Sequence, residues 1–220
     1  MILRLIIFIC LSSLFSGHAQ KSFEFDFVAE YKIRGGINRS MVTTQYQFYN
    51  SKDNSYMLWV NDDNESIHMW LTLESGQRYY DKINREDFFV EAISLKCPKT
   101  WTKRNSDYEN LKDYKVRKLP DTIINTNRYN YFVVNPLNKK EIKKKNLLPT
   151  YYIMDNTDNF KAPFLYPTGL LYRKWKKEST ITNGIIKEAF VVKNGTAESE
   201  MHLVQYIATK KIILIDIDCR

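Results

Sequence analysis

The chain has 220 residues, of which 44% are hydrophobic and 26% charged, and its formal net charge is +8. A chain of this length can bury an apolar core and needs no framework of disulfides. After the N-terminal segment, no apolar stretch is long enough for a membrane-spanning helix, so the mature protein is not expected to cross a membrane in this way.

Residues 1–19 have the parts of a secretory signal peptide. Arg4 gives a positive start, Leu5 to Phe15 is an apolar run, and Gly17-His18-Ala19 places small residues at a cleavage site. The run is too short to span a bilayer. We therefore expect cleavage after Ala19 and export of residues 20–220 to the periplasm or the cell exterior.

The region that follows predicts a meander of short strands. Its first strand has apolar residues with a period of two, at Phe23, Phe25, Phe27, Ala29, Tyr31 and Ile33. Clusters of turn-forming residues then separate five further strands, over 41–49, 56–60, 66–73, 77–81 and 87–93. Short connections favour antiparallel pairing between neighbours.

The middle of the chain is more polar. Residues 98–128 are rich in charged and amide side chains, which predicts an insertion or a long loop with a short helix near 107–114. Strands are predicted again over 128–135 and 150–154, with a lysine-rich turn or short helix over 137–146. Residues 168–178 predict a short helix capped by Thr168, although a strand is the alternative.

The last third predicts strands. Residues 185–193 are rich in branched and aromatic side chains, and Asn194-Gly195 is a strong hairpin signal. Two further strands, over 200–208 and 211–218, would form a hairpin through Thr209-Lys210. The last of them is apolar on both faces, which indicates a central position in the sheet.

These elements predict a mainly β fold in one domain, residues 20–220. A sheet of about ten strands tends to curl or to split in two. We therefore expect one curved antiparallel sheet, a half-barrel, with one or two short helices against its concave face. A closed β-barrel or a β-sandwich is the alternative.

No catalytic or metal-binding constellation is found. The two mature histidines, His68 and His202, lack neighbours at metal-ligand spacing, and no serine or cysteine has a nearby base. The carboxylates that flank strand ends are expected to serve solubility. The sequence therefore predicts no enzyme, no metal and no cofactor.

Signal cleavage leaves Cys97 and Cys219 as the mature cysteines. In an oxidising compartment they could pair and tie the C-terminus to the middle of the chain. Two free thiols are the alternative.

Two basic runs form a candidate surface. They lie over 139–145 and 173–177, and the candidate residues are Lys143, Lys144, Lys145, Arg173, Lys174, Lys176 and Lys177. Basic side chains beside an aromatic residue are typical of membrane-surface contacts. The alternative is that Trp175 packs inward and the lysines are simply solvated.

The chain resembles small exported β proteins of Bacteroidetes-type bacteria, and among these the lipoprotein-carrier-like (LolA/LolB-like) half-barrel group. The resemblance rests on the signal ending His18-Ala19-Gln20, on Phe23-Glu24-Phe25-Asp26-Phe27, on the meander from Tyr46 to Leu58, and on the C-terminal hairpin. It implies a curved sheet whose concave face holds an acyl chain. The polar segment 98–128 departs from this pattern.

The leading hypothesis is a non-enzymatic exported protein that binds an apolar or amphipathic ligand, such as a lipid or lipoprotein. Candidate lining residues, which an ordinary core would also contain, are Phe25, Phe27, Tyr46, Phe48, Leu58, Ile67 and Met69. The alternative is an envelope interaction protein whose basic face meets anionic polysaccharide, a membrane surface or an acidic protein. Nucleic acid is a poor partner for an exported chain.

Overall fold

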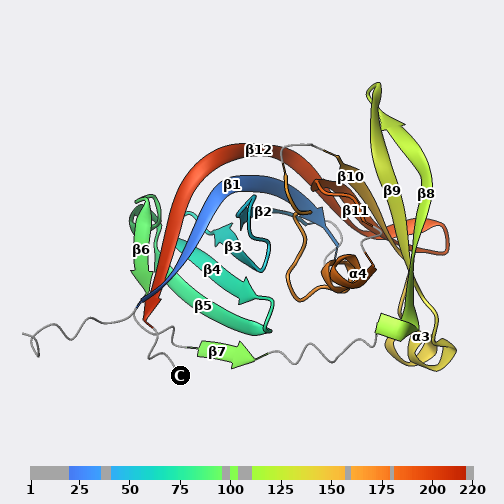
Figure 1. The fold of residues 1–220 in the computed structure, drawn as a ribbon, viewed down its shortest axis with the longest axis horizontal. Helices are drawn as coiled ribbons and strands as arrows, with labels where there is room; N and C mark the ends of the chain where they lie inside the picture. Colours follow the sequence, from blue (N-terminus) through green and yellow to red (C-terminus); the bar gives the residue numbers. More distant parts are fainter. Residues whose placement is uncertain are drawn as a thin grey trace, which may run out of the picture.

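The computed structural model describes residues 20–35, 41–95, 100–103, 111–156, 160–178 and 181–216. Their strands form one open, curved sheet, shown in Figure 1. In pairing order the path is β7 (Thr100–Lys103), β5 (Gln77–Asn84), β4 (Ser66–Leu73), β3 (Tyr56–Asp62), β2 (Val42–Tyr49), β1 (Gln20–Arg34), β12 (Thr196–Asp216), β11 (Ile185–Lys193), β10 (Thr150–Asp155), β9 (Asn127–Pro136) and β8 (Tyr114–Ile124). The curved antiparallel sheet predicted from the sequence is confirmed.

The remaining elements are short. Strand β6 (Ala92–Leu95) pairs with β12 in parallel, outside the main path. The helices are α2 (Arg85–Phe88), α3 (Lys139–Lys145), α4 (Leu170–Glu178) and the 3₁₀ turn η2 (Leu111–Asp113). Helix α4 lies under the arch of β1 and β12 (Figure 1), and the prediction of a helix rather than a strand there is confirmed.

Three predicted elements are wrong. The expected strand over 87–93 is helix α2 followed by a turn, and β6 begins at Ala92. The apolar run Phe88-Phe89-Val90 imitates a strand, but only Phe88 is buried. The polar segment predicted as a loop contains β7 and the eleven-residue strand β8, while the expected helix is described only as η2.

The third error concerns the C-terminus. Residues 196–216 form one strand of 21 residues, not a hairpin with a turn at Thr209-Lys210. The polar pair sits instead at an irregularity in the pairing with β1. The expectation of a central position is confirmed, because β12 pairs with β1, β11 and β6. The Asn194-Gly195 turn is also confirmed, with φ values of 52° and 80°.

At this irregularity, the face of β1 that carries the buried side chains changes. Phe25 pairs with Lys211, but Phe27 pairs with Ala208, so that Asp26 alone lies opposite Thr209 and Lys210. Without it, residues two apart would stay on one face. Here Phe25 packs into one core cluster and Phe27 against another. The Asp26 carboxylate accepts hydrogen bonds from the amide (2.7 Å) and hydroxyl (2.5 Å) of Ser51.

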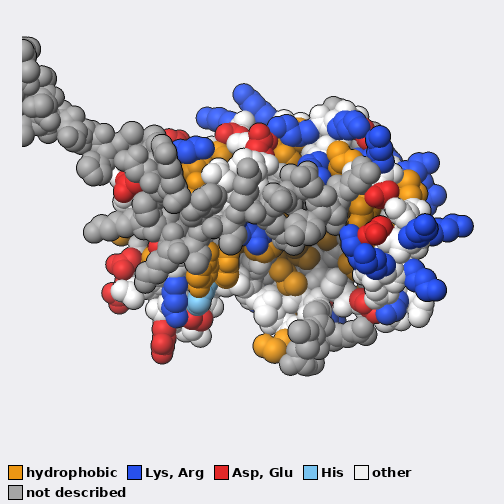
Figure 2. All heavy atoms as spheres, turned by 90° about the horizontal axis from the view of Figure 1, so that it is seen from below, with side chains coloured by type: hydrophobic (Ala, Val, Ile, Leu, Met, Phe, Trp, Pro, Cys, Tyr) orange, Lys and Arg blue, Asp and Glu red, His pale blue; other side chains and the backbone are white. Residues whose placement is uncertain are grey.

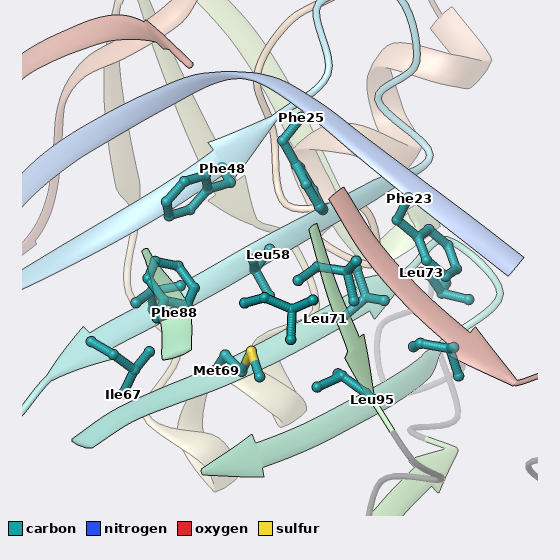
Figure 3. Packing of buried hydrophobic residues seen from close by; sticks show 14 residues of the cluster. Phe23, Phe25, Phe48, Leu58, Ile67, Met69, Leu71, Leu73, Phe88 and Leu95 are labelled. Atoms are coloured by element: carbon teal, nitrogen blue, oxygen red, sulfur yellow. The ribbon is translucent and has the colours of Figure 1, made fainter. Parts of the chain in front are cut away.

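The first core cluster lies between β2–β5 and the layer that crosses them (Figure 3). That layer consists of the start of β1, the end of β12, β6 and α2. Side chains from both layers point toward one another, and the members are Phe23, Phe25, Phe48, Leu58, Val60, Ile67, Met69, Leu71, Leu73, Phe88, Ile93, Leu95, Ile213 and Ile215.

Two further clusters lie on the opposite face of the sheet. The second core cluster joins Ala29, Tyr31, Tyr49, Met57, Ile185 and Leu203 of the sheet to Phe160 and Phe164. The third core cluster packs α4 on β9–β11, through Phe132, Val134, Met154, Leu165, Leu171, Tyr172, Ile181 and Ile186. Strand β3 is therefore covered on both faces, which explains its continuous apolar sequence.

Lys211 fixes the α2–β6 segment over the first core cluster. Its side chain is buried, with 4% of the residue exposed. The ammonium group donates to the carbonyl oxygens of Phe88 and Val90, the latter at 2.6 Å, and lies 4.1 Å from the centroid of the Phe88 ring. Burial lowers the pKa of Lys211 to about 8.

This lysine predicts a specific pH dependence of stability. Because its pKa is about 8 in the folded protein and near 10.5 ordinarily, the unfolded chain holds the proton more tightly. Stability should therefore rise as pH increases from about 8 towards 10. Denaturant unfolding of the wild type and of Lys211→Met, compared at about pH 7.5 and about pH 9.5, isolates this contribution. An unchanged stability difference between the two proteins would contradict it.

Candidate functional site

An open cleft lies at one end of the first core cluster. Its volume is about 450 Å³, and it is enclosed by the start of β1, the loop between β2 and β3, and the turn between β4 and β5. The lining residues are Lys21, Ser22, Phe23, Asp53, Ser55, Tyr56, Leu73, Glu74, Ser75 and Gln77.

The cleft has an apolar floor and a polar rim. Phe23 and Leu73 belong to the first core cluster and lie together at its edge in Figure 3, and Tyr56 packs against the same cluster. The rings of Phe23 and Tyr56 meet edge to face, with centroids 5.2 Å apart. The other lining residues supply hydroxyl, amide, carboxylate and ammonium groups. The lining is therefore more polar than that of most small-molecule sites, which are predominantly apolar with a few polar groups.

Glu74 on the rim is tied to helix α4. Its Oε2 accepts hydrogen bonds from the Tyr172 hydroxyl (2.6 Å) and from the Lys176 ammonium (2.7 Å). The hydrogen bonds from Lys176 and Tyr172 lower the pKa of Glu74. Burial and this carboxylate raise the pKa of Tyr172. Glu74 is therefore an ionised acceptor at neutral pH, a state that suits binding and differs from the raised pKa of a general acid.

The loop on the other side of the cleft is held by its own hydrogen bonds. Asn50 Oδ1 accepts from the amides of Lys52 (2.8 Å) and Asp53 (3.1 Å), and Asp53 Oδ1 accepts from the amide of Ser55 (2.9 Å). The Tyr56 hydroxyl donates to the carbonyl of Glu24 at 2.9 Å, across to β1. These hydrogen bonds fix the conformation of this side of the rim.

The predicted lining residues do not form one surface. Phe25, Phe48, Leu58, Ile67 and Met69 are members of the first core cluster, each no more than 7% exposed. Tyr46 packs against the same cluster, whereas Phe27 packs against the second. None of the seven lines the cleft. All but Phe27 belong to or pack against the cluster behind the cleft, and the role of the seven as ligand contacts stays a prediction.

The face of β3–β5 that carries Trp59, Trp70 and Tyr80 is the one turned toward the segment 160–166. These three residues are direct cross-strand neighbours, and Trp59 stacks against Tyr166 with centroids 5.2 Å apart. His68 shares this face, as predicted from its alternation with Ile67 and Met69, and its ring contacts the Tyr80 hydroxyl (2.8 Å) and Asp63 (3.0 Å).

The predicted basic surface divides in the structure. On α4, Lys174 is buried and pairs with Glu178 at 2.9 Å, Lys176 pairs with Glu74, and Lys177 is exposed. Arg173 is half-buried, and Trp175 packs against the third core cluster. On α3, Lys143 and Lys144 are exposed, and Lys145 pairs with Glu141 at 2.7 Å. Cys97 and Cys219 lie outside the described residues.

The rim residues were not found from the sequence. Ser55 and Ser75 resemble ordinary turn residues, and Ser22 and Gln77 resemble ordinary residues at the start of a strand. Their segments come together only in the folded protein. The signal that could have identified Glu74 is its place in the Glu74-Ser75-Gly76 turn after a buried strand. No cluster of three or more His, Cys, Asp or Glu that could hold a metal occurs among the described residues. Within the same residues, no helix is long and apolar enough to cross a membrane.

The chain is similar to solved structures but to no known family. No family model and no curated protein matches the chain. Among solved structures, the chain is similar to a domain from Vibrio parahaemolyticus described as an outer membrane lipoprotein-sorting protein, an assignment that is itself provisional for that protein. The match has 10% identity and a TM-score of 0.28, and covers 93% of this chain and 92% of the other. At these values the similarity says nothing about ligands or site residues of this chain.

The Glu74 cluster predicts the effect of removing one hydroxyl. Tyr172→Phe deletes a hydrogen bond to a carboxylate and should lower the free energy of unfolding by about 1 kcal/mol, the low end expected because Glu74 is 42% exposed. The pKa of Glu74, followed by carboxyl-carbon NMR, should rise toward its ordinary value. Because the pKa of Glu74 is lowered in the folded wild type, the stability that this carboxylate contributes is lost as pH falls below about 4.5. Tyr172→Phe should lose less stability over the same pH range. An unchanged pKa of Glu74 in the variant would refute the hydrogen bond from Tyr172.

Proposed function

We propose that this protein is an exported, non-enzymatic binding protein that holds an amphipathic ligand in the cleft. The observation that carries the proposal is the pairing of an apolar floor, formed by Phe23, Tyr56 and Leu73, with a polar, preformed rim. Such a site removes the apolar part of a ligand from water and leaves its polar part hydrogen-bonded.

The size of the cleft limits the ligand. At about 450 Å³ it lies in the lower part of the range of small-molecule sites, roughly 300–1,000 Å³. The first core cluster behind it is filled by its own side chains. The cleft therefore suits a single short chain or ring with a polar head, or one end of a longer lipid, and not a complete lipoprotein.

The charges on the rim favour a ligand head that donates hydrogen bonds. Asp53 and Glu74 are carboxylates, the second already paired with Lys176. Among the described lining residues, Lys21 is the cation, with its ammonium 5.0 Å from the centroid of the Phe23 ring. Ser22, Ser55 and Ser75 add hydroxyl groups. Hydroxylated or amine-bearing heads satisfy this set better than a bare anion does.

Native mass spectrometry of the protein purified from an exporting host tests the proposal. A stoichiometric ligand mass that is released by organic solvent, and identified as amphipathic, is the expected result. A clean mass without any ligand, together with no uptake of offered lysolipids, fatty amines or fatty acids, would refute the proposed function.

A tryptophan placed in the mouth should close the cleft. Ser22 is exposed at the rim, so Ser22→Trp fills the opening without entering the core, and ligand uptake should fall at least tenfold. Thr43→Trp is the matched control, since Thr43 is exposed on β2 and does not line the cleft. Isothermal titration with the ligand found by mass spectrometry provides the measurement. Equal losses in both variants would place the ligand elsewhere.

A further inference from the structure

The positive charge of this chain is concentrated at one end of the sheet. Residues 111–146, which form η2, β8, β9 and α3, contain ten Lys and Arg but three Asp and Glu, a net charge of +7 against +8 for the whole chain. Figure 2 shows Lys and Arg side chains gathered at this end of the molecule. The rest of the chain is close to neutral.

Much of this charge is presented on one capped helix. The Asn138 side chain accepts hydrogen bonds from the amides of Lys140 (3.1 Å) and Glu141 (3.3 Å), which fixes the start of α3. Asn146 ends the helix in a left-handed conformation, with φ of 51°. Lysines at 139, 140, 143 and 144 are all exposed.

The carboxylates of this end leave those lysines uncompensated. Glu141 is bound by Lys145 at 2.7 Å, and Asp121 is shared by Lys118 (3.6 Å) and Arg128 (4.0 Å). Among the described residues, no carboxylate lies within ion-pair distance of Lys139, Lys140, Lys143 or Lys144.

An apolar side chain is exposed beside the helix. Leu137 is 51% exposed and precedes the capping residue of α3. Its amide donates to the carbonyl of Asp113 at 2.6 Å, which holds it next to the start of β8, where Lys115 is also exposed. We call Lys115, Leu137, Lys139, Lys140, Lys143 and Lys144 the lysine surface.

We propose that the lysine surface docks the protein on an anionic lipid bilayer. Lysines near such a bilayer gain from its negative surface potential, and an exposed leucine among them gains from contact with the acyl boundary. A polysaccharide would match the charge but offers no apolar phase for Leu137. This docking does not depend on the cleft or on the proposed ligand.

Vesicle co-sedimentation tests the proposal on the whole protein. Phosphatidylcholine vesicles that contain phosphatidylglycerol should bind it, pure phosphatidylcholine vesicles should not, and high salt should release it because the charges are exposed. Failure to bind phosphatidylglycerol vesicles at low salt would overturn the proposal. The ligand measurements on the cleft stay interpretable in either case.

Charge reversal locates the surface. Lys139→Glu/Lys140→Glu should weaken vesicle binding by about tenfold or more, and acidic residues in the first turn of a helix keep α3 stable. Lys52→Glu/Lys161→Glu is the matched control, because both residues are exposed, lie outside residues 111–146 and give the same change of net charge. Equal weakening by both pairs would show a response to net charge alone and would reject the surface.

Leu137→Ser separates a bilayer from other polyanions. The variant should bind phosphatidylglycerol vesicles several-fold more weakly but should be retained on a dextran sulfate column as the wild type is. Unchanged vesicle binding by Leu137→Ser, with Lys139→Glu/Lys140→Glu losing both interactions, would identify an anionic polysaccharide or an acidic protein as the partner. Circular dichroism of each variant confirms that the sheet is retained.

Discussion

The architecture depends on the pairing of β1 with β12 along the length of β1, and on the first of the two irregularities in that pairing, at Asp26. Regular pairing would keep Phe25 and Phe27 on one face, and a single sheet would then cover a single core. The irregularity sends the start of β1 and the end of β12 across β2–β5, so that one pair of strands serves two layers. Such irregularities bend a strand and increase its twist, which gives the arch seen in Figure 1.

The cleft is a consequence of this crossing. The layer of β2–β5 and the layer that crosses it diverge away from the bend and leave an open end. At this end, the apolar edge of the first core cluster meets loops that supply polar groups. The side of the core beside the bend is covered by α2 and β6, held by Lys211 through carbonyl oxygens and the Phe88 ring. Burying a lysine costs stability, and its hydrogen bonds to the carbonyl oxygens of Phe88 and Val90 offset part of that cost.

Local patterns in the sequence were sufficient for most strands and for the curved antiparallel sheet. Alternation and clusters of turn-forming residues predicted β1–β5, and Asn194-Gly195 predicted the turn before β12. The errors came from residues whose conformation depends on distant partners. Thr209-Lys210 resembles a turn, but β1 pairs with the residues on both sides of it and keeps the strand continuous. Phe88-Phe89-Val90 resembles a strand, but Lys211 binds carbonyl oxygens of this segment in its helical turn. The rim of the cleft could not be predicted for the same reason. Ser22, Ser55 and Glu74 are distant in sequence, and no local sequence pattern indicates that they come together.

Helix α4 shows how a residue can be misassigned when its partner is distant. Its basic residues beside Trp175 are typical of a membrane-binding helix. In the structure, however, Lys176 forms an ion pair with Glu74, and Lys174 forms one with Glu178. The helix thus supports the rim of the cleft while its other face packs on β9–β11. By contrast, α3 has seven residues and no buried side chain, so its lysines have little to do inside the protein. Lysines without an ion-pair partner are available to bind another molecule. The exposed lysines of α3 are of this kind, whereas Lys174 and Lys176 of α4 stabilise the protein itself.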